Sequence, residues 1–208
     1  MRADALAKRR DLIAAARRLY ATHDTEVSLR SIAEEAGVGI ATLYRHFPTP
    51  LDLILGIADE IGAAIIDISR RWGLIWDEDP EASWRGFADE IAALRLGALV
   101  PRLIAAGQIT AFPTDMAGIR AQTMAAVDDI LARAKHEGLV REDVSAFRFH
   151  IGLAAMNRPL PEPALRELPD QHEWLTEVYL RGLRPDPDRP VRRGRSAPVR
   201  AHHGRAER

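Results

Sequence analysis

Residues 28–54 read SLRSIAEEAGVGIATLYRHFPTPLDLI, and this stretch decides the fold of the chain. Ser28 can cap a helix, because its hydroxyl accepts a hydrogen bond from an unpaired backbone N–H. Four apolar residues follow at positions i, i+3, i+4 and i+7 of one helical face: Leu29, Ile32, Ala33 and Ala36. Gly37 then ends the helix, as glycine does just past a C-cap. The pattern predicts a short helix with one buried face.

A second short helix is expected from about Ile40 to Phe47, with Leu43 and Phe47 on its inner side. Its outward positions are Ile40, Ala41, Thr42, Tyr44, Arg45 and His46. Two short helices joined at Gly37-Val38 describe a helix-turn-helix. The outward side chains suit a DNA major groove, since hydroxyl, imidazole and guanidinium groups contact phosphates and base edges.

The rest of the chain also repeats apolar residues at helical spacing, and no stretch alternates like a strand. A basic first helix is expected at about 3–22, with Leu6, Ile13, Ala16, Leu19 and Tyr20 on one side. Pro50 begins a long helix whose apolar stripe continues to Trp72. Further helices are predicted near 81–106 (with a bend), 114–136, 145–157 and 170–183, and 158–169 is expected to be a loop. The fold class is therefore all-α: a three-helix N-terminal unit and a C-terminal helical bundle.

Charge divides the chain into three parts, which we take as its domains. Residues 1–50 carry eight Lys/Arg and six Asp/Glu, whereas residues 51–183 carry thirteen and twenty-one. Residues 184–208 carry eight and three, contain four prolines and have few large apolar residues, so we expect a disordered basic tail. A basic N-terminal part, residues 1–50, followed by an acidic part, residues 51–183, indicates that the N-terminal end of the protein faces a polyanion.

Several classes of site are not indicated. The chain has no cysteine, which excludes disulfides and cysteine-ligated metals. His46, His150 and His172 come without any catalytic or metal-binding signature, and His202-His203 is an equally weak metal hint, so we expect no enzyme, cofactor or metal. No apolar run reaches the ~20 residues of a membrane span. Met1 to Tyr20 mixes charged and apolar residues, so we expect no signal peptide and a cytoplasmic location.

The quoted stretch closely resembles the DNA-binding signature of the tetracycline-repressor (TetR) family. The A-G-V turn, the T-L-Y core and the H-F ending occur in order, and the match covers about residues 8–57. The resemblance implies a homodimeric regulator, usually a repressor, that binds a near-palindromic DNA operator. It also implies that a small-molecule effector in the C-terminal domain moves the long helix from Leu51 to Trp72 and releases the DNA.

The family's DNA contacts carry over position by position. They fall on Ser28, Leu29, Arg30, Ile40, Ala41, Thr42, Tyr44, Arg45 and His46. Two positions depart from the family pattern. Gly39 replaces the usual Ser or Thr cap, and Pro50 replaces a lysine that commonly holds a phosphate, a loss for which Lys8, Arg9 or Arg10 can compensate.

The body carries candidates for the effector pocket and the dimer face. Aromatic and methionine side chains suit an adaptable apolar ligand, and those expected near the cavity are Trp72, Trp76, Trp84, Phe87, Phe112, Met116 and Met124. Simple core packing is the alternative for each. The resemblance places the dimer face on the last two helices, with Phe147, Ile151, Ala154, Trp174, Val178 and Tyr179, and burial within one subunit is the alternative. The acidic body would suit a cationic ligand, or it is a solvated surface.

Two other functions compete with the regulator. One is an enzyme built on a helical bundle, which the missing catalytic signature disfavours. The other is an interaction module whose helix-turn-helix packs on protein, and it would show no salt-dependent affinity for DNA. Activation and repression are not separated by the sequence.

Overall fold

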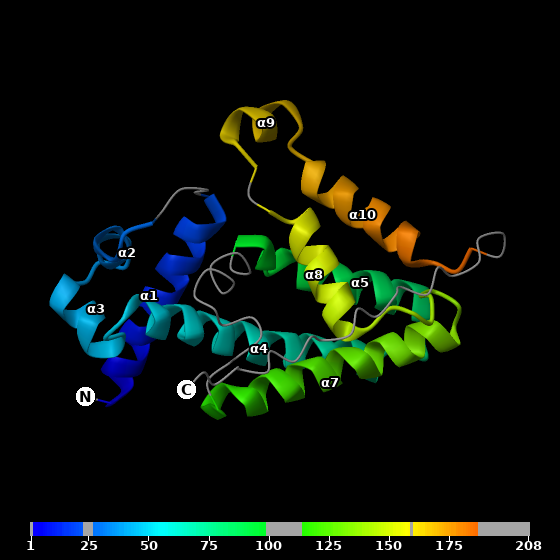
Figure 1. Ribbon diagram of the computed structural model, residues 1–208, viewed down its shortest axis with the longest axis horizontal. Coiled ribbons are helices and arrows are strands. Elements are labelled where there is room, and N and C mark those ends of the chain that lie inside the picture. Colours follow the sequence, from blue (N-terminus) through cyan, green and yellow to red (C-terminus); the bar gives the residue numbers. More distant parts are fainter. Residues whose placement is uncertain (1, 23–26, 99–113, 159, 187–208) are drawn as a thin grey trace, which may run out of the picture.

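The computed structural model describes residues 2–22, 27–98, 114–158 and 160–186 (Figure 1). Every regular element within those residues is a helix, which confirms the all-α prediction. In chain order they are α1 (Arg2–Thr22), α2 (Leu29–Glu35), α3 (Ile40–His46), α4 (Pro50–Leu74), α5 (Pro80–Ala93), the 3₁₀ turn η1 (Leu96–Ala98), α7 (Thr114–His136), α8 (Ala146–Met156), α9 (Glu162–Glu167) and α10 (Gln171–Leu183).

Local chemistry explains where these helices begin and end. The Ser28 hydroxyl accepts the backbone N–H of Ser31 at 3.0 Å and caps α2. Thr49 and Asp52 form a reciprocal capping box at the start of α4, with bonds of 2.9 and 3.2 Å. Gly37 follows α2 with φ +66°, a conformation that glycine adopts without steric cost. The sequence therefore sets the ends of the two helices that flank the turn.

The helices form a head and a body that α4 connects. Figure 1 shows α1, α2 and α3 together at one end, and α4 runs from them along the length of the body beside α7. α5 packs on α4, while α8 contacts α7 and η1, and α10 packs on α8. One long helix thus belongs to both parts of the molecule.

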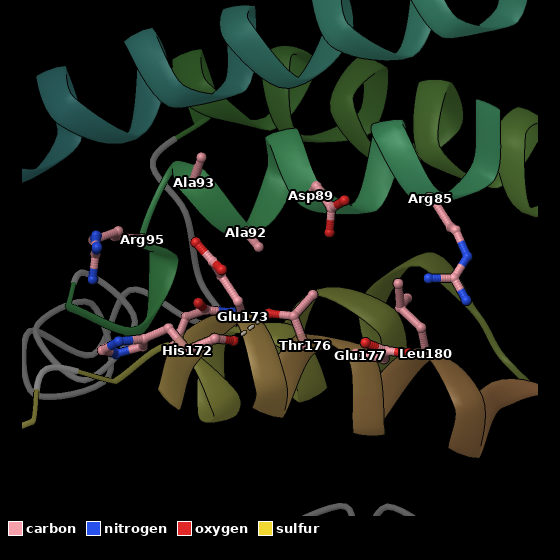
Figure 2. A pocket seen from close by; sticks show the side chains of 11 residues that line it. Arg85, Asp89, Ala92, Ala93, Arg95, His172, Glu173, Thr176, Glu177 and Leu180 are labelled. Carbon is pink, nitrogen blue, oxygen red and sulfur yellow. Dashed lines mark hydrogen bonds between the residues drawn. The ribbon is translucent and has the colours of Figure 1, made fainter. Parts of the chain in front are cut away.

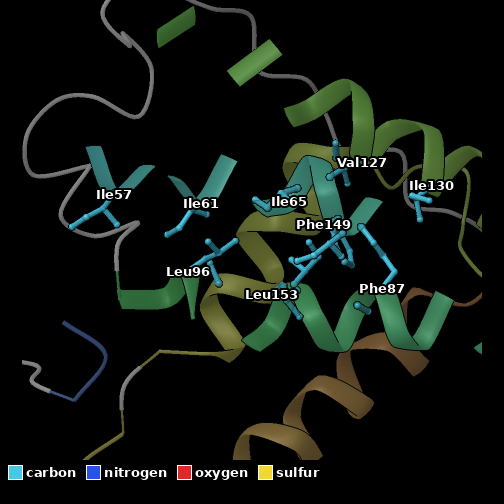
Figure 3. Packing of buried hydrophobic residues seen from close by; sticks show 14 of the residues in the cluster. Ile57, Ile61, Ile65, Phe87, Leu96, Val127, Ile130, Phe149 and Leu153 are labelled. Carbon is cyan, nitrogen blue, oxygen red and sulfur yellow. The ribbon is translucent and has the colours of Figure 1, made fainter. Parts of the chain in front are cut away.

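The core follows the apolar stripe of α4 into the body. Ile57, Ile61, Ile65 and Ile68 on this helix are all buried, and Figure 3 shows the first three facing the interior. Behind them the rings of Trp84, Phe87 and Phe149 pack within 5.4–5.9 Å of one another. Ring pairs at these distances attract one another in addition to burying apolar area. The stripe predicted from the sequence is therefore the inner face of the connecting helix.

Two expectations about the helices were wrong, and a third is tested only in part. Residues 158–169 are not entirely loop, because Pro163 falls in the first turn of α9, where a missing N–H costs nothing. α5 ends at Ala93, and Arg95 with φ 53° then turns the chain so that Gly97 packs on the end of α8, which is a break within the segment 81–106 where a bend was expected; residues 99–106 lie outside the described part. Leu6 on α1 is exposed, although it was expected on the inner side. Residues 99–113 and the basic tail after residue 186 lie outside the described part.

Candidate nucleic-acid interface and the helical body

The inner face of α3 is buried in the head. Leu43 has no exposed surface and Phe47 only 2%. They join Leu12 and Ile13 of α1 and Ile32 of α2 in one apolar cluster. Because three helices contribute to this cluster, the orientation of α3 is held from behind. A short helix needs such support, since seven residues in isolation do not remain helical in water.

The outer face of α3 presents unpaired polar groups. Tyr44 is 49% exposed, Arg45 is exposed and His46 is half-buried, with its ring 6.5 Å from that of Phe47. Arg45 forms no ion pair or hydrogen bond with another described residue, and neither does the exposed Arg30 of α2. α3 contains no acidic residue. The two guanidinium groups are therefore available to an external anion.

The structure corrects part of the outward set. Ile40 is half-buried and packs against the core cluster, as does Leu29. Thr42 is half-buried, whereas Ala41 is exposed. The Ser28 hydroxyl already accepts the Ser31 N–H and bonds the Ser31 hydroxyl at 2.8 Å. Ile40 and Leu29 thus pack inside the helix-turn-helix with part of each side chain and remain exposed with the rest.

The basic residues of α1 differ in what they contact. Lys8 pairs with Asp4 at 3.0 Å on the surface, whereas Arg9 lies over the Phe47 ring. Arg10 is exposed and has no ion pair within the described residues. Farther along α1, Arg17 reaches Glu60 of α4 at 3.6 Å. Of the three residues that can replace the lysine absent at Pro50, Arg10 alone is exposed and unengaged.

The predicted pocket residues lie in several environments. Trp76, Trp84 and Phe87 are buried core residues, and Met124 is half-buried beside the core. The indole N–H of Trp72 donates to Glu90 at 3.0 Å. Phe112 lies outside the described residues, as does the side chain of Met116. None of the predicted set lines the cavity between α5 and α10 or the cavity between α4 and α7, so their role as a pocket remains a proposal.

The larger of these cavities has a volume of about 450 Å³ and lies between α5 and α10. Figure 2 shows Asp89 reaching into it from α5 and Glu173 from α10. The second cavity, of about 350 Å³, lies between α4 and α7 and includes Arg70, Asp129 and Arg133 in its lining. The sequence contained no signal for the first cavity, because its walls come from helices about 80 residues apart.

The predicted dimer residues divide into two groups. Phe147, Trp174 and Val178 are 51%, 57% and 46% exposed, so they add apolar surface to the outside of the subunit. Ala154 is buried within the subunit, and the Tyr179 hydroxyl donates to the Phe149 carbonyl at 3.1 Å. The alternative of burial within one subunit therefore holds for Ala154 and accounts for Tyr179, while α8 and α10 keep an exposed apolar face.

On α8 and α10, burial shifts the pKa values of two side chains. Burial lowers the pKa of His150, whose Nδ1 bonds the Ala146 carbonyl at 3.0 Å while its Nε2 has no partner among the residues that the structure describes. Burial raises the pKa of Tyr179 to about 12. The described residues include no group of three His, Asp or Glu placed to hold a metal ion. None of the described helices combines the length and apolar character needed to cross a bilayer.

Comparisons with known proteins agree with this architecture. Residues 12–64 match the model "Bacterial regulatory proteins, tetR family", and residues 79–185 match "Transcriptional regulator SbtR-like, C-terminal domain". A TetR transcriptional regulator of Streptomyces coelicolor is 27% identical with a TM-score of 0.56, and the match covers 85% of this chain and 98% of that one. A TetR transcription regulatory protein of Mycobacterium vanbaalenii is 28% identical with a TM-score of 0.56, and that match covers 88% of this chain and 99% of the other. No curated protein compared with the chain matches it significantly.

Proposed function

Because the chain belongs to the TetR family of transcriptional regulators, which bind DNA and are not enzymes, we propose that it is a homodimeric repressor released from a palindromic operator by a small molecule. The observation that carries the proposal is the two-sided character of α3. Leu43 and Phe47 anchor it in the head, while Tyr44 and Arg45 extend outward without partners among the described residues.

In the proposed complex α3 enters the major groove. Arg45 donates to a base edge, because a guanidinium can form two parallel hydrogen bonds to guanine. Tyr44, Thr42, His46 and Ser28 contact phosphates and set the register, and Arg30 contacts a base or a nearby phosphate. Ala41 gives close approach to the bases. Ile40 and Leu29 contribute through their partly exposed edges, which suits a thymine methyl group better than a hydrogen-bonding edge.

Dimerisation supplies the spacing of the two heads. The exposed Phe147 of α8 and Trp174 and Val178 of α10 support a four-helix seam between subunits, with Ile151 at its edge. Two recognition helices then reach half-sites one helical turn apart, roughly 34–36 Å, or a multiple of it. The domain division that accompanies this proposal is 1–50 for DNA, 51–183 for effector and dimer, and 184–208 for the basic tail.

Release would act through α4. This helix begins in the head at Pro50 and ends in the body at Leu74, so a shift at its body end moves the head. Leu53 and Ile57 of α4 are buried in the same apolar cluster as the residues of α1 and α2, so we expect the head and α4 to move together. Arg17 of α1 also pairs with Glu60 of α4 at the surface. Effector binding would then exchange free energy with DNA binding through one rigid element.

The decisive experiment is selection of bound DNA from a random duplex pool by the purified chain, followed by sequencing. We expect an enriched near-palindrome whose affinity falls steeply as salt concentration rises. A reporter gene placed behind the selected sequence should lose expression when the protein is present. An enriched sequence with raised reporter expression would make the protein an activator. Absence of enrichment, or affinity independent of salt, would remove the DNA-reading role of α3.

A further inference from the structure

The cavity between α5 and α10 has no role in the proposed function, because none of the predicted pocket or dimer residues lines it. Its walls run along two helices. The lining residues extend from Arg85 to Ala93 on α5 and from His172 to Leu180 on α10, each span being ~12 Å at the rise of an α-helix. Ala92, Ala93 and Leu180 supply apolar surface. The cavity is therefore an elongated trough of about 450 Å³.

Two carboxylates point into this trough without partners. Asp89 on α5 and Glu173 on α10 form no ion pair or hydrogen bond with another described residue (Figure 2). The other charges are engaged or lie at the end: Glu177 pairs with Arg181 at 2.5 Å, Arg85 with Glu81 at 3.1 Å, and Arg95 lies beyond the end of α5. The centre of the trough is thus negative.

The surroundings of Asp89 show that this arrangement is unfavourable when the trough is empty. Burial raises the pKa of Asp89, and the charges of Glu173 and Glu177 raise it further, against the opposing effect of Arg85. Like charges that face one another repel, and solvent screens part of this repulsion because Asp89 and Glu173 are both exposed. A cation placed between the two helices would relieve the repulsion and bond both sides.

Asn157 adds an independent acceptor to the same trough. Its side chain is 5% exposed and lines the cavity, and its Nδ2 donates to the Leu153 carbonyl at 3.0 Å. The carboxamide oxygen accepts no hydrogen bond within the described part of the chain. Thr176, 4% exposed, donates its hydroxyl hydrogen to the His172 carbonyl, which leaves its oxygen lone pairs unused. Both oxygens can still accept a hydrogen bond, so a ligand with N–H donors fits here.

We propose that the α5–α10 trough binds an aliphatic polyamine, with ammonium groups at Asp89 and Glu173, an N–H directed to Asn157, and methylene groups against Ala92 and Leu180. A metal ion does not fit, because the described residues bring no three metal-binding side chains together. Arg95 keeps the ammonium groups toward the centre of the trough.

Binding would also draw the first half of α10 toward α5. The other end of α10 is already tied to α5 by the ion pair of Arg184 with Glu81, and to the α7–α8 connection by the Arg141 N–H and Leu183 carbonyl at 2.8 Å. Trp174 lies on the half of α10 that would move, and Val178 lies near the middle of this helix. Any change that polyamine binding makes in dimerisation or in DNA affinity presupposes the proposed function. Polyamine binding itself does not depend on that function.

The test is isothermal titration of the full chain with spermidine, beside 1,8-octanediol as a neutral molecule of similar length and Mg²⁺ as a compact cation. We expect spermidine to bind, the diol not to bind, and Mg²⁺ not to displace spermidine at equal charge concentration. Asp89→Asn and Glu173→Gln should each weaken spermidine by about ten-fold, since each removes a charge-assisted hydrogen bond. Glu142→Gln, an exposed carboxylate outside the trough, should leave the affinity unchanged.

Three results would overturn the site: no heat with spermidine, equal binding of the diol, or unchanged affinity in the Asp89→Asn/Glu173→Gln double variant. Thermal melts monitor folding, and the double variant should melt no lower than the parent, because a repulsion has been removed. DNA affinity measured without spermidine separates the two proposals. If the chain binds its DNA but not spermidine, only the proposed polyamine site is refuted. If it binds spermidine but no DNA, only the proposed regulator function is refuted.

Discussion

The guanidinium of Arg9 lies over the ring of Phe47, with 5.1 Å between its central carbon and the ring centroid. Gly56 of α4 meets the same pair, since a Cβ built on it would lie 2.9 Å from Phe47 Cε1 and 3.0 Å from Arg9 Nη2. Three helices of the head and its connector therefore meet at one point. Only glycine leaves room there for both the ring and the cation.

We therefore predict that Gly56→Ala destabilises the chain by about 1–2 kcal/mol, because overpacking outweighs the helix propensity gained. Urea unfolding measures the change. Gly118→Ala is the control, since a Cβ there meets no atom within 4 Å and the same substitution should be neutral or stabilising. If both variants gained stability equally, the close contact at Gly56 would be unimportant.

Arg45→Ala should weaken operator binding by about ten-fold or more and relax preference at one base pair, because a base-edge contact is worth ~1–3 kcal/mol. Tyr44→Phe should lower the affinity for all DNA sequences by a similar factor, since the hydroxyl is proposed to contact a phosphate. Fluorescence anisotropy on the selected duplex and on single-base variants distinguishes the two effects. Arg166→Ala on α9 serves as the control, and an unchanged preference in Arg45→Ala contradicts the assigned role.

Trp174→Ser should shift the chain from dimer toward monomer, because it removes a large apolar side chain that is 57% exposed in one subunit. Sedimentation equilibrium gives the dissociation constant, which we expect to rise at least ~ten-fold. Leu74→Ser is the matched control, since Leu74 is 79% exposed at the far end of α4. Dissociation caused by Leu74→Ser alone would place the interface elsewhere.

His150 should make stability depend on pH below neutrality. Burial lowers its pKa in the folded chain, so the unfolded chain binds the proton more readily as pH falls below 6.5. The unfolding free energy should therefore decrease from pH 7 to pH 5. His150→Gln should flatten this slope in urea titrations at each pH, whereas His136→Gln, at an exposed position, should not. An unaltered slope in His150→Gln would assign the dependence to other groups.

Tyr179 should ionise later than ordinary tyrosines. Burial raises its pKa to about 12 in the folded chain, so the unfolded chain loses the proton first, and stability should fall as pH rises from 10 toward 12. Absorbance at the tyrosinate band follows the three tyrosines of the chain. Tyr179→Phe should remove the latest step, and persistence of that step would assign it to Tyr20 or Tyr44.

The helix-turn-helix was predictable almost to the residue from the sequence. Ser28, Gly37 and Pro50 act through local backbone chemistry, so their effect on where helices begin and end does not depend on distant contacts. The capping box of Thr49 and Asp52 had the same kind of signal, a Thr followed three residues later by an acid. The apolar stripe of α4 was equally evident, because helical periodicity is a local property.

What the sequence alone determined about this protein is the helix-turn-helix, most of the other helices, the inner face of α4 and the family to which the chain belongs. The tertiary structure decided which apolar residues remain exposed, so that Trp174 and Val178 face outward while Ala154 is buried. It also brought Asp89 and Glu173 to one trough and Gly56 against Phe47. Side chains from helices far apart in the chain meet only after packing has set the angles between helices, and spacing along the chain does not contain that information.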